Sequence, residues 1–429
     1  MTTNYVDSHV QQFVNKIDQL SQPIDPKLGT VFQKTFLNTL ETTISDDEQG
    51  YAFILTGDIP AMWQRDSTAQ VRPYLALAHE QPAIATLITR VVQRQFFNMA
   101  IDPYANAFNE TANGHGHQTD QTEMGPWIWE RKFEIDSLCY PVQLAYLLYK
   151  NTGVTAQFDD NFVTGVKRLL TTFETEQHHA TSPYRFVRTV DRPEDTLERD
   201  GMGTPVADTG MIWSGFRPSD DACEYGYLIP ANMFAVVILD YLQSIFSSVL
   251  DDPNIVARAR RLQAAVRDGI ETYGYTTNAN GEKVYAYEVD GLGHAKLMDD
   301  GNVPSLLSAP YLGYCDLLDP NYQRTRQTLL SPENPYYYSG RLAAGQGSPH
   351  TPAHYIWPIA IAMEGLTTNS RDQQLAALQT LIETTGGTDL MHESFNVDDD
   401  TQFTREWFSW ANMMYCELLL TTLGFKIER

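Results

Sequence analysis

The sequence predicts an all-α protein folded as an (α/α)6 barrel, with loops that form a site at one end and minor β-hairpins. Apolar residues recur with a helical period in twelve segments of the 429-residue chain, and no Pro- or Ser-rich linker separates them. Six antiparallel helix pairs, each with its loops, would take roughly 70 residues per pair, which suits this length. Because no sequence repeat is visible, two smaller helical bundles stay an alternative. We treat residues 1–429 as a single domain.

The expected helices follow one another with short connections. They cover residues 6–20, 26–44, 67–78, 82–99, 135–149, 159–178, 229–248, 254–274, 321–330, 352–366, 371–385 and 407–423. Asn-Thr-Gly at 151–153 and Gly-Gly at 386–387 are typical helix stops. The clearest strand signal is residues 283–289, which we expect to form a hairpin with 273–277.

Composition excludes several classes of function. Hydrophobic residues make up 42 % and charged residues 20 %, as in a globular protein with a sizeable core. The net charge of −24 argues against nucleic acid or an anionic membrane as partner, since both attract basic patches. The most apolar segment, residues 233–250, contains Asp240 and Gln243, so we expect a buried helix there.

The four cysteines, Cys139, Cys223, Cys315 and Cys416, are single and widely spaced, with no CxxC pair. This pattern argues against a zinc knuckle or a redox motif and favours reduced thiols. The first twelve residues lack the basic and apolar regions of a secretion signal. We therefore expect a cytoplasmic protein.

Six blocks that mix charged and aromatic residues, each beside a helix start, suggest a common site on loops. The first, TGDIPAMWQRDSTAQVRPY (56–74), contains Arg65 and Asp66. Buried charges of this kind need partners, and charges beside aromatic rings suit a carbohydrate pocket. The alternative is a surface turn in which Asp66-Ser67 caps a helix. The second block, WIWERKFEIDS (127–137), contains Asp136, which could likewise be a helix cap.

The third block, SGFRPSDDACEYGYLIP (214–230), carries the adjacent carboxylates Asp220 and Asp221 among aromatic residues. A neighbouring carboxylate and an apolar surround both favour the protonated acid that a general acid must be. The alternative is an exposed acidic turn.

The remaining blocks add a second carboxylate and further polar groups. MDDGNVPSLL contains Asp300, and its spacing lacks the distal Glu of a calcium loop. HTPAH contains His350; Pro352 and the missing Glu argue against a zinc motif. The sixth block, from MHESF to FTREWFSWAN, contains Glu393 and Arg405. Two carboxylates from distant loops in a pocket rich in Trp and Tyr indicate glycoside hydrolysis.

These blocks, in this order and over most of the chain, resemble glycoside hydrolase family 125, the exo-acting α-1,6-mannosidases of bacteria and fungi. The resemblance implies an (α/α)6 barrel, inversion of anomeric configuration, a mannose-containing oligosaccharide with an α-1,6 linkage as substrate, and no metal or other cofactor. It implies Asp220 as general acid and Glu393 as general base, although Asp221 stays open as the acid. It further suggests a set of grips on the terminal mannose: Arg65, Asp66, Asp136, Asp300, His350 and Arg405.

Other classes stay in view. A glycan-binding protein would have the pocket without turnover, and a release assay separates the two. Another (α/α)6 enzyme, an epimerase or a lyase, would call for paired histidines or a basic pocket, which the acidic blocks do not suit. A metal-dependent mannosidase would lose activity on chelation.

Overall fold

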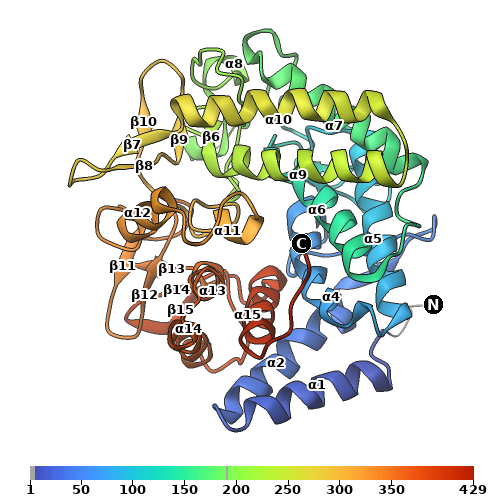
Figure 1. Cartoon of the computed structure of the whole chain (residues 1–429), viewed down its shortest axis with the longest axis vertical. Coiled ribbons are helices and arrows are strands. Elements are labelled where there is room, and N and C mark those ends of the chain that lie inside the picture. The colour runs from blue at the N-terminus through green and yellow to red at the C-terminus, as the bar shows by residue number, and fades with distance from the viewer. Residues whose placement is uncertain (1–4, 190–191) are drawn as a thin grey trace.

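The computed structural model describes residues 5–189 and 192–429 (Figure 1). Fifteen α-helices occur in this part of the chain: α1 (Ser8–Ser21), α2 (Pro26–Asn38), α3 (Gln64–Val71), α4 (Leu75–Ala78), α5 (Pro82–Ile101), α6 (Ile135–Thr152), α7 (Asp160–Glu176), α8 (Glu198–Gly201), α9 (Ile229–Ser248), α10 (Pro253–Tyr273), α11 (Ala309–Leu312), α12 (Pro320–Leu329), α13 (Pro358–Leu366), α14 (Arg371–Glu383) and α15 (Ser409–Thr422).

The helices alternate between an inner and an outer layer along the chain. From their packing we place α2, α5, α7, α10, α12 and α14 outside, and α3–α4, α6, α9, α11, α13 and α15 inside. The inner helix α3 packs against α6, α6 against α9, and α15 against both α13 and α3. Within the described residues this is six helix pairs in a ring, the predicted architecture.

The two layers differ in sequence as their burial requires. The outer helix α10 buries one stripe, Ile255, Ala259, Leu262, Val266 and Ile270, at helical spacing. The inner helix α9 is apolar on nearly all sides. It is long and apolar enough to cross a membrane, but most of it is buried inside the protein, as expected for a core helix.

Short strands join the loops at the starts of inner helices. β3 (Met62–Trp63), β4 (Ala107–Phe108) and β5 (Ile128–Glu130) form one antiparallel sheet. A second contains β6 (Tyr227–Leu228), β9 (Glu288–Val289) and β10 (Ala295–Lys296), and a third β13 (Tyr355–Ile356), β14 (Ser394–Asn396) and β15 (Asp399–Thr404). Strands β3, β6 and β13 come directly before α3, α9 and α13, so they hold the connecting loops at the helix starts.

Three two-stranded sheets complete the described part of the fold. They are β1 (Ile44–Asp46) with β2 (Ala52–Ile54), β7 (Tyr275–Thr277) with β8 (Lys283–Tyr285), and β11 (Tyr337–Ser339) with β12 (Ala344–Gln346). The pair β7–β8 is the predicted hairpin in part: the strand predicted over 283–289 ends at Tyr285, and Glu288–Val289 form β9 in another sheet.

Two expectations need correction. The twelve predicted helices are not the twelve helices of the barrel. The first of them, α1, packs against α2 outside the barrel. Its place among the barrel helices is taken by the four-residue α11, which is too short to show a helical period in the sequence. The helix predicted over 352–366 begins only at Pro358, because His354 has a positive φ and residues 355–356 form β13. The predicted stop at Gly153 is confirmed: it caps α6 in the left-handed conformation.

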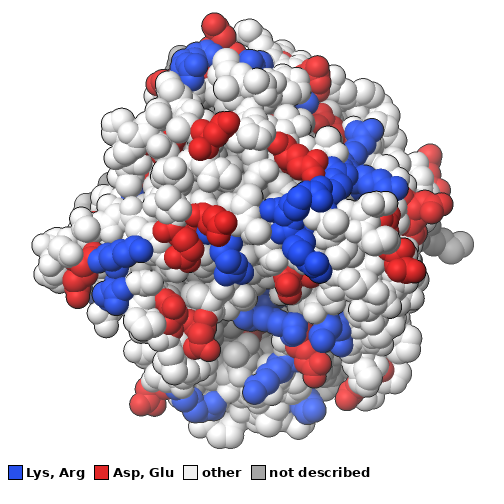
Figure 2. All heavy atoms as spheres, turned by 45° about the horizontal axis from the view of Figure 1, so that its top comes forward, with Lys and Arg blue, Asp and Glu red and all other residues white. Residues whose placement is uncertain are grey.

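Charge is mixed on the surface. On the face shown in Figure 2, acidic and basic side chains are interspersed rather than separated into two regions. The net charge of −24 is therefore not gathered in one acidic patch on this face.

Candidate active site

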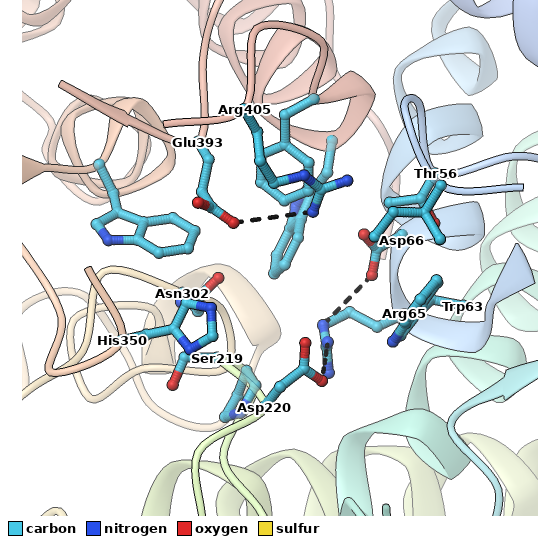
Figure 3. Close-up of a pocket in the computed structure, with 15 residues that line it drawn as sticks. Thr56, Trp63, Arg65, Asp66, Ser219, Asp220, Asn302, His350, Glu393 and Arg405 are labelled. Atoms are coloured by element: carbon cyan, nitrogen blue, oxygen red, sulfur yellow. Dashed lines mark ion pairs between the residues drawn. The ribbon is translucent and has the colours of Figure 1, made fainter. Parts of the chain in front are cut away.

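A cavity of about 370 Å3, open mouth included, lies among the loops that precede the inner helices (Figure 3). Six of the eight predicted site residues line it: Arg65, Asp66, Asp220, His350, Glu393 and Arg405. Its other walls include the rings of Trp63, Trp357, Phe408 and Trp410 and the polar side chains of Thr56, Ser219 and Asn302. Charged groups beside aromatic rings suit a sugar, which has both hydroxyls and an apolar face.

A tight turn orients the two adjacent aspartates differently. The Asp220 N–H donates to the Arg217 carbonyl at 2.9 Å, and the Arg217 N–H donates to the Asp221 carbonyl at 2.8 Å. Asp220 is left-handed, with φ 68°, a conformation that non-glycine residues seldom adopt without a reason. Its side chain is 32 % exposed and lines the cavity, whereas that of Asp221 is fully buried. The turn thus presents Asp220 rather than Asp221 to a ligand.

Glu393 lies across the cavity from Asp220 (Figure 3). It directly precedes β14, and its N–H donates to the Thr404 carbonyl at 3.3 Å. Arg405 Nη1 lies 3.8 Å from Glu393 Oε1, and Arg405 itself is held by an ion pair with Asp58. Like Asp220, Arg405 has a positive φ, of 43°. The side chains of Asp220 and Arg405 are therefore both directed into the cavity from a strained backbone conformation.

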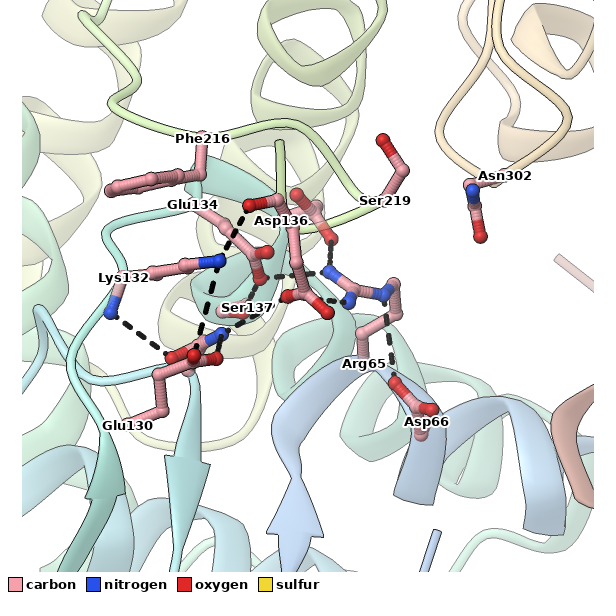
Figure 4. A network of polar contacts seen from close by, with 12 residues as sticks. Arg65, Asp66, Glu130, Lys132, Glu134, Asp136, Ser137, Phe216, Ser219 and Asn302 are labelled. Carbon is pink, nitrogen blue, oxygen red and sulfur yellow. Dashed lines mark hydrogen bonds and ion pairs between the residues drawn. The ribbon is translucent and has the colours of Figure 1, made fainter. Parts of the chain in front are cut away.

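Arg65 lines the cavity and is the centre of a buried charge network that extends behind the cavity wall (Figure 4). Its Nη1 donates to Glu134 Oε2 at 2.8 Å and to Asp136 Oδ2 at 3.0 Å. Asp66 lies 3.5 Å from Arg65 Nε, and Asp220 lies 4.0 Å from Nη2. One guanidinium thus faces four carboxyl groups, which fixes its orientation and links the acid candidate to the barrel core.

Because the buried network contains more carboxyl groups than cations, its carboxyl groups favour the protonated form. Burial raises the pKa of Asp66 to about 6, against the opposing charges of Arg65 and Arg405. Burial also raises the pKa of Glu134 and of Asp136, although Arg65 acts in the opposite direction. The network therefore takes up protons more readily than exposed carboxylates would.

Asp136 and Asp300 do not line the cavity. Both are fully buried, one layer behind the wall. Asp136 holds Arg65, while Asp300 accepts from Ser219 Oγ at 2.7 Å and from Asn302 Nδ2 at 3.0 Å. Neither of these two predicted grips therefore lines the cavity, and each contacts a residue that does.

Sequence reasoning did not assign site roles to Glu134, Ser219, Asn302, Trp357 or Trp410. All five lie inside the polar-aromatic blocks, of which the one around HTPAH covers residues 345–358, so block membership was the available signal. Whether a residue of these blocks lines the cavity or supports a lining residue from behind depends on how deeply the fold buries it. Arg65, for example, lies 5.5 Å from the Trp410 ring, although the two are 345 positions apart in the chain.

Within the described residues, no three His, Cys, Asp or Glu side chains gather in a way that could hold a metal ion. His115 and His117, close together in the sequence HGH, lie in an exposed loop. We therefore assign no metal ligands.

Comparison with known proteins supplies the family. Residues 25–420 match the family model described as metal-independent α-mannosidase (GH125). The chain is 36 % identical to the meiotically up-regulated gene 157 protein of Schizosaccharomyces pombe, over 97 % of this chain and 87 % of that protein.

Solved structures agree with this assignment. A Streptococcus pneumoniae structure, from work on metal-independent α-mannosidases and N-linked glycan processing, is a non-productive complex with α-1,6-mannobiose. It shares 53 % identity, covers 99 % of this chain and 100 % of its own, and has a TM-score of 0.98. A bacterial glucoamylase complexed with acarbose shares the fold alone, at 13 % identity and a TM-score of 0.58, over 97 % of this chain and 58 % of its own.

Proposed function

Because the chain belongs to the GH125 family of metal-independent α-mannosidases, we propose that this glycoside hydrolase is an exo-acting α-1,6-mannosidase that inverts anomeric configuration. The α-1,6 linkage is supported by the disaccharide in the Streptococcus pneumoniae structure. The observation that carries the proposal is that Asp220 and Glu393, 173 positions apart in the chain, line opposite sides of one small cavity.

The proposed reaction is a single displacement. Asp220, protonated, donates its proton to the glycosidic oxygen as the bond to C1 breaks. Glu393, ionised, accepts a proton from a water molecule that attacks C1 from the opposite face. The product is β-mannose from an α-linkage, and the water supplies the new hydroxyl. Inversion requires roughly 6.5–9.5 Å between the two carboxyl groups, whereas about 5–5.5 Å would give retention.

The shape of the cavity supports removal of one terminal sugar. Aromatic rings and Arg405, which is held by its ion pair with Asp58, wall the cavity, whose volume is about 370 Å3 with its open mouth included. We propose that the non-reducing mannose fills this space and that the rest of the oligosaccharide leaves past Asp220, because the acid must reach the leaving oxygen.

Proton NMR of the EDTA-treated enzyme acting on α-1,6-mannobiose tests the proposal. Early β-mannose is the expected product. Early α-mannose would overturn inversion and the role of Glu393 as base. Binding without hydrolysis would favour a glycan-binding protein, and recovery of activity on metal addition would overturn metal independence.

Two variants test the residue roles. Asp220→Asn and Glu393→Gln should keep the wild-type circular dichroism spectrum and lose at least about 100-fold in kcat, the contribution typical of general acid–base groups. Ser45→Ala, away from the cavity, serves as the matched control. Near-wild-type turnover by either carboxyl variant would remove that residue from the mechanism.

We also propose that the enzyme works in the cytoplasm on short mannose-containing oligosaccharides. All four cysteines are free, and three of them are buried, which suits a reducing compartment. Cell fractionation with activity measurement tests the location; activity found only outside the cell would contradict it.

A further inference from the structure

Asp221, beside the proposed acid, is a fully buried carboxylate with its own partners. Its Oδ1 accepts from His350 Nδ1 and from Arg192 Nη2, each at 2.9 Å. Its Oδ2 is buried and has no hydrogen-bond partner in the described part of the chain. An anion in this position is retained only where its charge is compensated, here by a guanidinium and an imidazole.

The contact determines which nitrogen of His350 can meet a ligand. A carboxylate only accepts, so Nδ1 must carry the hydrogen that it donates to Asp221. The His350 N–H donates to Ser348 Oγ at 3.1 Å, which fixes the backbone beside the ring. His350 lines the cavity, so the free nitrogen, Nε2, is the ring atom available to a sugar (Figure 3).

Charges on three elements face the ring. Asp220 and Asp221 come from the turn after Arg217, Glu393 from the loop before β14, and Arg192 from the segment before α8. Burial opposes the charged imidazole, but the hydrogen bond and charge of Asp221, aided by Glu393 and Asp220, raise the pKa of His350 above its ordinary value. Arg192, with Nη1 3.4 Å from His350 Nδ1, opposes them.

We propose that Asp221 is a positioning residue that holds the His350 ring through Nδ1 and aims Nε2–H at a hydroxyl of the bound sugar, with Arg192, on the same carboxylate, limiting the strength of this effect. The inference rests on the proposed function for the identity of the ligand. His350 then acts as a pH-dependent grip. The grip is complete at low pH and is lost as the pH rises through the pKa of His350, so KM should rise at alkaline pH.

The first experiment is NMR titration of ring-labelled histidine in the free enzyme, with the His350 signal assigned by its loss in His350→Asn. Asp221→Asn should shift the His350 titration to lower pH. Arg192→Gln should shift it to higher pH, because it removes a neighbouring positive charge. Shifts of opposite sign are the signature of electrostatic positioning, which general loss of structure would not produce.

The second experiment is the pH dependence of KM for α-1,6-mannobiose. In Asp221→Asn the alkaline rise in KM should begin at lower pH, and a titration midpoint lower by one pH unit corresponds to about a tenfold loss in affinity at a fixed alkaline pH. In Arg192→Gln the rise should begin at higher pH. If Asp221→Asn does not fold, Arg192→Gln still tests the inference, because the Arg192 side chain is 36 % exposed and Asp221 keeps its hydrogen bond from His350 in this variant.

The outcomes separate this inference from the proposed function. If neither variant moves the His350 titration, or both move it in the same direction, the positioning role is wrong even when the wild-type enzyme hydrolyses mannobiose. If the titrations shift as expected but no mannobiose is hydrolysed, the electrostatic coupling stands and the substrate assignment fails.

Discussion

Asp66→Asn is expected to make this enzyme more stable at neutral to alkaline pH and less active. The Asp66 side chain is 5 % exposed, and its Oδ2 accepts no hydrogen bond from the described residues. Its nearest cation, Arg65 Nε, is 3.5 Å away, while the same guanidinium has shorter contacts with Glu134 and Asp136. Asn removes the buried charge and leaves Arg65 with two close partners.

The magnitude follows from the pKa. Burial raises the pKa of Asp66 from 3.8 to about 6. A group with a raised pKa stabilises the fold below its unfolded value and loses that contribution as pH rises through the folded value. A pKa raised by about two corresponds to about 3 kcal/mol at pH 8. Because the new amide must also find partners, we expect Asp66→Asn to gain about 1–3 kcal/mol at pH 8 and little at pH 4.

Urea unfolding followed by tryptophan fluorescence at pH 4, 5, 6, 7 and 8 measures this difference. Asp47→Asn is the matched control, because Asp47 is equally buried but lies 2.7 Å from Arg94 Nη1; it should destabilise the protein at pH 8. Activity of Asp66→Asn should fall about 10- to 100-fold, as expected for loss of a charged hydrogen bond to substrate. A variant less stable than wild type at pH 8, or a difference that does not change with pH, would refute the reasoning.

Three further predictions concern the charge network, the cavity entrance and the metal. Arg65→Met should cost about 3–5 kcal/mol in urea unfolding, because buried carboxylates lose their cation, and adding Glu134→Gln should recover part of it; a double variant no more stable than the single would contradict the network. Asp58→Asn should change stability by less than about 1 kcal/mol, because the pair is partly exposed, yet raise KM by loosening Arg405; unchanged steady-state kinetics would argue against a role for this pair. Dialysis against EDTA should leave the rate of mannobiose hydrolysis unchanged, and a loss restored by Ca2+ or Zn2+ would contradict metal independence.

Much of the fold could be predicted because the barrel helices obey local rules. Helix α9 has the predicted bounds, and α10 differs by one residue at each end, since each has a Pro at its start and a long apolar period. Helix α11 could not be predicted, because four residues carry no measurable period, and packing against α9 determines their conformation.

The sequence predicted which segments form the site, but it did not predict which residue in each segment lines the cavity. The sequence by itself determined which residue types gather there, because charged and aromatic side chains adjacent in the chain need either a ligand or buried partners. The tertiary structure alone decided that the left-handed turn at Asp220 exposes that carboxyl and buries Asp221. It alone decided that Asp136 and Asp300 support the wall from behind. Depth and direction depend on contacts between segments far apart in the chain, which the order of residues does not specify.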